Sequence, residues 1–183
     1  MTENNLLVWM DLEMTGLDSS ADKILEIATI ISDTDMNVLH HGPELVIHQS
    51  DEVLANMNEW CMEHHGNSGL TEKVRNSAVS EQEAESLTLE FLKQHIPEGE
   101  VPLCGNSIHQ DRNFLVKHMP ALNEYLHYRN IDVSSIKELT FRWFPSLPKF
   151  KKSGAHTALQ DILESVEELK YYKEKVFRED PLL

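Results

Sequence analysis

The stretch Leu6–Met14 (LLVWMDLEM) decides the fold, because it is apolar apart from two acids and its length suits a buried strand. A second run, Ile24–Ser32 (ILEIATIIS), is rich in β-branched residues and predicts another strand. Val38–His48 predicts a third strand after a turn at 33–37, with Gly42-Pro43 marking a bulge or a sheet edge. Three strands joined by short turns predict an antiparallel meander.

Helical patterning replaces the strand pattern after residue 49. Ser50 predicts the start of a helix, because serine caps helix N-termini and two acids follow it. Beyond it, helices and short strands are interspersed, an order that favours an α/β fold: a mixed sheet with helices on its faces. The expected elements are a helix from 50 to about 64, a helix opened by a capping box at 80–83 and ended near 97, a strand at 101–105, a helix from about 106, a strand at 128–133, a helix opened by a second capping box at 135–138 and reaching 144, and a long helix ending at about 176.

The composition is that of an ordinary globular chain with a strongly acidic balance. Its 183 residues favour a single domain over 1–183, and 31 acidic against 16 basic residues give a formal charge of −15. This charge argues against a surface for extended duplex nucleic acid, which needs many Lys and Arg contacts to phosphates. Cys61 and Cys104 make no disulfide framework, and the first residues lack the pattern of a signal peptide or membrane span. We therefore expect a cytoplasmic protein that does not enter membranes.

Two acids stand in the middle of the first predicted strand. Asp11 and Glu13 are two residues apart, so their side chains share one face with the apolar Leu7 and Trp9. Two like charges on a buried face are costly unless cations neutralise them, and Mg²⁺ prefers carboxylate oxygens. The pair therefore indicates a metal site; the alternative is a face exposed to solvent or paired with basic side chains.

Three further residues extend this signal. Asp111 lies in the first turn of a predicted helix, while His156 and Asp161 flank the start of the last one. Singly, each fits a structural role: a helix-dipole partner, a neutral terminal histidine or an exposed helix acid. Together, four carboxylates can hold two divalent ions about 4 Å apart for displacement at phosphorus, and a histidine can take the proton of the attacking water.

The order of these residues is similar to that of a known family. Asp11-x-Glu13, Asp111 and His156-x-Ala158-x-x-Asp161 resemble the DEDD 3′→5′ exonucleases of the subgroup with a catalytic histidine. Longer strings resemble the oligoribonucleases within that superfamily, and the likeness runs from about residue 6 to 173. These strings are WMDLEMTGL at 9–17, CGNSI at 104–108, QDR at 110–112, YR at 128–129, DVS at 132–134 and KEL at 137–139.

The resemblance implies a fold, a reaction and a set of site residues. It implies an RNase H-like α/β fold, a homodimer, two Mg²⁺ or Mn²⁺ ions, and hydrolysis of very short RNAs, chiefly dinucleotides, to 5′-mononucleotides. His156 would be the general base. The implied metal ligands are Asp11, Glu13, Asp111 and Asp161, and the implied substrate contacts are Leu17 as a wedge against the bases, Trp60, His65, and a 5′-phosphate cap of Ser107, Arg129, Ser134 and the other subunit's Tyr128.

Two positions depart from the expected pattern, and two other functions stay open. His109 stands where a small residue is expected, and Gln160 where a second acid is frequent; we expect both to tune activity, because neither is a predicted ligand. One alternative is an exonuclease of the same superfamily that trims longer RNA or DNA 3′ ends. The other is a module that binds short nucleotides without turnover.

Overall fold

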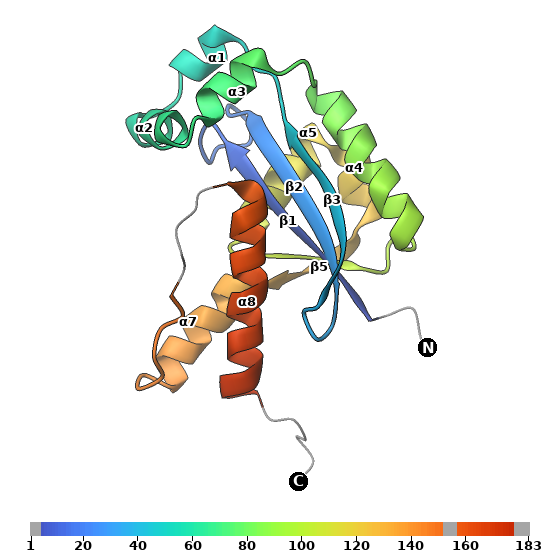
Figure 1. Cartoon of the computed structure of the whole chain (residues 1–183), viewed down its shortest axis with the longest axis vertical. Helices are drawn as coiled ribbons and strands as arrows, with labels where there is room; N and C mark the ends of the chain where they lie inside the picture. The colour runs from blue at the N-terminus through green and yellow to red at the C-terminus, as the bar shows by residue number, and fades with distance from the viewer. Residues whose placement is uncertain (1–4, 152–156, 178–183) are drawn as a thin grey trace.

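A mixed sheet forms the centre of the molecule. The computed structural model describes residues 5–151 and 157–177, and its five-stranded sheet has the order β3-β2-β1-β4-β5 (Figure 1). Its antiparallel part, which confirms the predicted meander, comprises β1 (Leu6–Met14), β2 (Ile24–Asp33) and β3 (Val38–Val46). The strands β4 (Pro102–Gly105) and β5 (His127–Asp132) continue the sheet in parallel with β1.

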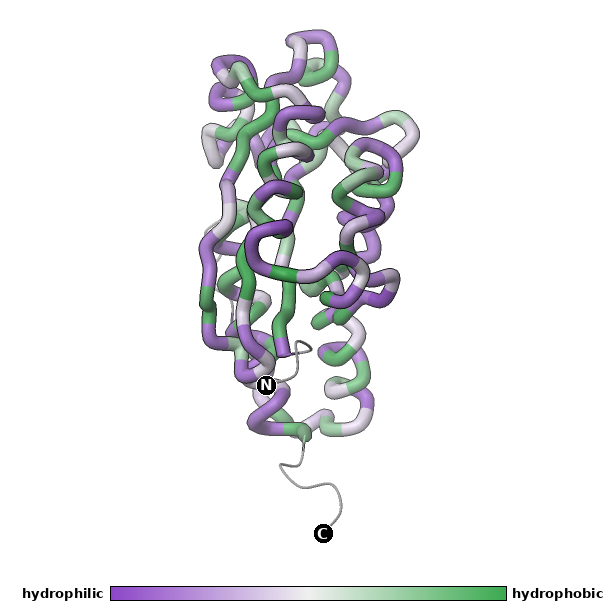
Figure 2. The backbone as a smooth tube through the Cα atoms, turned by 90° about the vertical axis from the view of Figure 1, so that its right-hand side faces the viewer, coloured by the Kyte–Doolittle hydropathy of each residue, from purple (hydrophilic) through white to green (hydrophobic). Residues whose placement is uncertain are grey.

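Helices cover both faces of the sheet, as expected for its apolar central strands. Leu7 and Trp9 of β1 pack under α7 (Val133–Trp143) and α8 (Ala158–Val176). The alternate residues of β1, such as Val8 and Met10, pack on the opposite face, where they meet α4 (Glu81–His95), α5 (His109–His118) and α6 (Pro120–Tyr125). Figure 2 shows hydrophobic and hydrophilic residues alternating along the chain, which is the pattern of elements with one buried face.

The single helix expected at 50–64 is wrong, because the structure has two helices there. Ser50 caps α1 (Asp51–Ala55) as predicted, but α1 ends after five residues. Asn58 then caps α2 (Glu59–Asn67) by accepting the N–H of Cys61 at 2.8 Å. A further short helix, α3 (Leu70–Asn76), follows Gly69, whose φ of 76° lies in the left-handed region that favours glycine.

Two other boundaries differ from the sequence-based expectation. The capping box at 135–138 is wrong as a helix start. The N-cap of α7 is Asp132, three residues before Ser135, and it accepts the N–H of Ser134 at 3.1 Å. The separate helix α6 was not expected; it opens with Pro120, a residue that suits a first helical turn. The cap at Ser80 is confirmed, since its hydroxyl accepts the N–H of Glu83 at 3.2 Å.

Within residues 5–151 and 157–177, no helix has the length and apolar character needed to cross a membrane.

Candidate active site

Three carboxylates converge where β1 meets the start of α8. Asp11 and Glu13 project from the same face of β1 as predicted, and α8 docks on that face through Ala158 and Ile162. This docking places Asp161, in the first turn of α8, against the two strand acids. One oxygen of each carboxylate lies within 4.8 Å of the others, and the described residues contain no other such group of three His, Cys, Asp or Glu side chains.

Asp111 approaches the same strand from the opposite side. It is buried in the first turn of α5, and its Oδ1 accepts the backbone N–H of Leu12 at 2.9 Å. Leu12 lies between the two strand acids, so this bond fixes the fourth predicted carboxylate beside them. Burial raises the pKa of Asp111 to about 7, because an ionised carboxylate is poorly solvated there.

The pKa of Glu13 is raised by burial and by the neighbouring acids. Burial is the main cause that raises the pKa of Glu13 from 4.5 to about 7, followed by the negative charge of Asp161 and then those of Glu26 and Asp111. This repulsion is what bound cations would relieve. The donor set therefore fits hard divalent ions, which take carboxylate oxygens.

A cleft with an apolar wall opens next to Glu13. It has a volume of about 400 Å³, and the structure brings three of the predicted substrate-binding residues, Leu17, Trp60 and His65, to its wall. Leu17 is 69% exposed and Trp60 is 67% exposed, so both present apolar surface to a ligand rather than to the core. Trp60 also stacks on His64, with ring centroids 4.6 Å apart.

His65 ties the wall of this cleft to the acidic strand. It is buried, its Nε2 lies 2.9 Å from the backbone oxygen of Met14, and its Nδ1 lies 3.9 Å from Glu13 Oε2. The second distance lies at the outer limit of an ion pair. Burial, however, lowers the pKa of His65 while raising that of Glu13, so near neutral pH we read this contact as an uncharged imidazole beside a carboxyl group.

The two predicted cap serines also meet. Ser107 Oγ lies 3.1 Å from Ser134 Oγ, and both border a hollow of about 530 Å³ at the carboxyl ends of β4 and β5. Asp132 orients the two residues, because its Oδ1 accepts both backbone N–H groups. His109, noted above for its unexpected size, borders the same hollow.

The remaining predicted residues are not brought together in the same way. Tyr128 is 73% exposed, and the Arg129 guanidinium lies 5.2 Å from its ring centroid, but neither residue lines the hollow of the two serines. His156, the predicted general base, lies outside the described residues. Gln160 takes part in the cap of α8, because its backbone N–H donates to Thr157 Oγ1 at 3.4 Å.

Comparisons with known proteins agree with this arrangement. The family model described as Exonuclease matches residues 8–169. A protein of Dictyostelium discoideum named as a probable oligoribonuclease is 60% identical over 94% of this chain and 90% of its own length. The chain belongs to the exonuclease family, among the oligoribonucleases. An oligoribonuclease of Shewanella loihica is 57% identical over 94% of this chain and 96% of its own length.

Solved exonucleases confirm the fold expected of this family member. One exonuclease I structure superimposes with a TM-score of 0.72 at 15% identity, covering 93% of this chain and 41% of that one. A zinc-bound complex of E. coli exonuclease I with single-stranded DNA gives 0.75 at 14% identity, covering 96% and 42%. The RNase H-like α/β fold is therefore confirmed, as a mixed sheet with helices on its faces.

Sequence reasoning missed one acid of this exonuclease-family site. Glu26 stands directly opposite Glu13 in the antiparallel register, is 3% exposed, and accepts the N–H of Ala158 at 3.3 Å. It therefore links β2 to the first residue of α8, the helix that carries Asp161. The available signal was an acid inside the apolar run at 24–32.

Proposed function

We propose that this protein is a 3′→5′ exoribonuclease that hydrolyses very short RNAs, chiefly dinucleotides, to 5′-mononucleotides. The observation that carries the proposal is the convergence of Asp11, Glu13 and Asp161 beside a cleft whose wall presents Leu17 and Trp60. The relatives named oligoribonuclease, at 57 and 60% identity over most of both chains, support the same reaction.

We further propose that the site takes two divalent ions, Mg²⁺ or Mn²⁺. Asp11, Glu13 and Asp161 would hold the first ion, and Asp11 would bridge to the second with help from Asp111, directly or through water. When bound, such ions would acidify an attacking water and offset the charge on the leaving oxygen. The hard oxygen donors and their mutual repulsion fit this assignment.

The protein's own side chains would supply positioning and proton transfer. His156 would accept the proton of the attacking water, a role that histidine side chains can fill near pH 7. Leu17, Trp60 and His65 would hold the bases, Trp60 through its exposed ring.

A closed 5′ end would explain the preference for short substrates. The hydroxyls of Ser107 and Ser134 would donate to the 5′ phosphate, and Arg129 would add a charged contact. In a homodimer, Tyr128 of the other subunit would complete this cap. A longer RNA would have to continue through the cap, whereas a dinucleotide ends there. Because a dinucleotide carries few phosphates, the protein would not need a basic surface to bind it.

One assay separates this function from its alternatives. The protein would be incubated with Mn²⁺ or Mg²⁺ and 5′-labelled RNAs of two and about seven nucleotides, the second exceeding one ordinary ligand pocket. We expect faster cleavage of the dinucleotide, lost with a chelator and with His156→Ala. Faster cleavage of the longer RNA would favour a general exonuclease, and binding without cleavage would favour a non-catalytic module. The cytoplasmic location and the single exonuclease domain over 1–183 stay predictions.

A further inference from the structure

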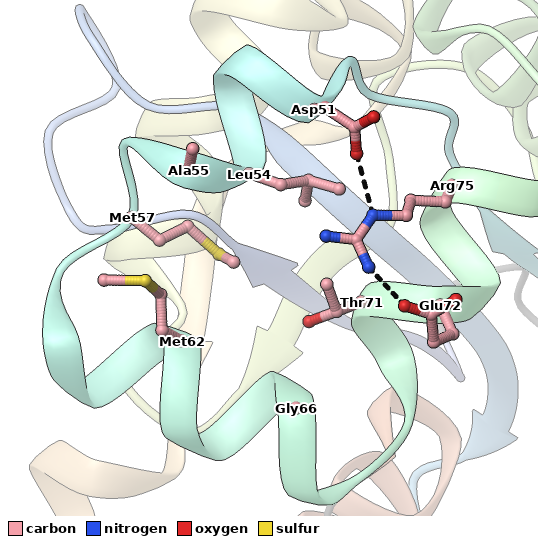
Figure 3. A pocket seen from close by; sticks show the side chains of 9 residues that line it. All are labelled: Asp51, Leu54, Ala55, Met57, Met62, Gly66, Thr71, Glu72 and Arg75. Atoms are coloured by element: carbon pink, nitrogen blue, oxygen red, sulfur yellow. Dashed lines mark hydrogen bonds and ion pairs between the residues drawn. The ribbon is translucent and has the colours of Figure 1, made fainter.

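A second hollow lies on the other face of α2, away from the cleft. We call it the α1–α3 hollow, because α1, α2 and α3 supply most of its walls (Figure 3). Its volume is about 730 Å³, within the roughly 300–1,000 Å³ of small-molecule sites. The residues of α2 divide between the two cavities: Trp60 and His65 border the cleft, whereas Met62 and Gly66 border the α1–α3 hollow.

The floor of the α1–α3 hollow is apolar and adaptable. Leu54 and Met57 are buried in the hydrophobic cluster beneath it, and Met62, 42% exposed, contributes a second thioether to the wall. Methionine side chains are flexible and polarizable, and they make favourable contacts with aromatic rings. This floor suits the face of a flat ring.

Two polar groups of α3 stand above that floor, one turn apart. Arg75 donates through Nε to Asp51 at 2.8 Å and through Nη1 to Glu72, while its Nη2 points into the hollow and makes no hydrogen bond to the described residues (Figure 3). The Thr71 hydroxyl is buried and also has no hydrogen-bond partner among them. A buried polar atom of this kind indicates an absent water or ligand group.

The charges at the rim select against anions. Asp51 and Glu72 outnumber the single guanidinium between them, so a phosphate or carboxylate entering beside Arg75 would meet net negative charge. The free Nη2 instead suits a neutral acceptor, such as a ring nitrogen or a carbonyl oxygen. We propose that the α1–α3 hollow binds an uncharged planar heteroaromatic molecule of nucleoside size, with its ring over Met57 and Met62 and an acceptor edge on Arg75.

A ligand in the α1–α3 hollow would act on the cleft through α2, which borders both cavities. α2 packs chiefly on α3 rather than on the sheet, and its Met62 and Gly66 border the α1–α3 hollow, so a ligand there would touch this helix directly. The same helix carries Trp60, and its His65 contacts Met14 of β1. A bound ligand is therefore expected to change the KM for a dinucleotide. This effect rests on the proposed function, whereas the binding of the ligand to the α1–α3 hollow does not.

The test uses the methionines as local probes. The whole chain would be labelled with ¹³C-methyl methionine and titrated with inosine in chelator, with activity assayed separately in Mn²⁺. Met57 and Met62 line the α1–α3 hollow, whereas Met14 lines the cleft, so their methyl signals report the two cavities separately. We expect Met57 and Met62 to shift saturably with an apparent affinity of their own, whatever shift Met14 reports from the cleft, and weaker binding of inosine 5′-monophosphate because of its charge.

Two variants sharpen the result. A Cβ at Gly66 would meet no atom within 4 Å, so Gly66→Leu should fill the hollow without disturbing the fold and should weaken binding by at least about tenfold. Arg75→Lys, which keeps the charge but loses Nη2, should cost about tenfold for one lost hydrogen bond. Glu63→Leu adds the same side chain at an exposed position of α2 outside the hollow and should bind like the wild type.

Either of two results would overturn the proposal. One is the absence of a saturable shift at Met57 and Met62 up to about 10 mM inosine. The other is wild-type affinity in a folded Gly66→Leu protein. If inosine shifts Met57 and Met62 in a protein that fails to cleave dinucleotides, the ligand site stands and only the proposed function fails.

Discussion

Replacing Glu13 by glutamine should stabilise the metal-free protein, although it removes a proposed metal ligand. The Glu13 side chain is only 17% exposed, and burial followed by the charge of Asp161 raises its pKa from 4.5 to about 7. A carboxyl group with a raised pKa ionises more easily in the unfolded chain. It therefore destabilises the fold increasingly as the pH rises from about 4.5, and the penalty is complete above about 7.

The size of this effect follows from the pKa of Glu13. A pKa about 2.5 above the ordinary value corresponds to about 3 kcal/mol of unfolding free energy at pH 8, where the folded protein must ionise Glu13. At pH 5 the group is protonated in the folded state and mostly ionised in the unfolded chain, so by the same relation the difference falls below about 1 kcal/mol. Glu13→Gln should thus gain about 2–3 kcal/mol at pH 8 and little at pH 5.

Urea denaturation in chelator at the two pH values measures this difference. The midpoint should rise for Glu13→Gln at pH 8 with an unchanged m-value, whereas Glu63→Gln, an exposed acid of α2, should leave it unchanged. Saturating Mn²⁺ should then stabilise the wild type more than Glu13→Gln, because only the wild type keeps the full ligand set. Equal stability of the two proteins at pH 8, or a gain of the same size at both pH values, would refute the reasoning.

Three further substitutions test the proposed roles by activity and binding. Asp161→Ala should lower turnover on the order of a thousandfold or more, with the fold intact by circular dichroism. The control Glu167→Ala, on the exposed side of α8, should keep activity. A folded Asp161→Ala enzyme with normal turnover would contradict the proposed site. Arg129→Ala should weaken dinucleotide binding by about 10–100-fold and leave Mn²⁺ affinity unchanged in calorimetry, because one charged phosphate contact is lost; an unchanged dinucleotide affinity would remove Arg129 from the cap. Trp60→Ala should raise the KM for a dinucleotide by about 5–100-fold with a smaller change in kcat, since stacking on one base contributes ~1–3 kcal/mol; an unaltered KM would show that its exposed ring does not touch the base.

The sequence predicts those parts of the fold and site that depend on periodicity. Residues two apart on a strand share a face, so Asp11 and Glu13 could be placed side by side before any tertiary contact was known. Helical spacing predicts the last helix itself, but not which face of the sheet it covers. The grouping of Asp161 with the strand acids came from the family resemblance, and in the structure the packing of α8 brings the three carboxylates together.

Features that depend on one local hydrogen bond were not predictable in the same way. Ser50 and Asn58 are both good N-cap residues, and a pattern of apolar spacing alone does not reveal that the second one starts a new helix eight residues after the first. Similarly, Asp132 and Ser135 could each open α7. Asp132 does so in the structure, and it also accepts the N–H of Ser107 from a different strand end, a contact that only the parallel pairing of β4 and β5 creates.

Glu26 shows why the acidity of the site exceeds what its motif contains. An acid in an apolar run looks like a solvent-facing position, yet the register of β1 and β2 sets it against Glu13, and α8 covers it through Ala158. Burial raises the pKa of Glu26, as it does for Glu13 and Asp111, so the fold concentrates three carboxyl groups that resist ionisation. Such a centre destabilises the metal-free protein as it ionises with rising pH, and the ionised carboxylates are the form that binds hard cations. The stability of the metal-free protein is therefore expected to fall as its proposed affinity for divalent ions rises, because both changes follow from ionisation of the same side chains.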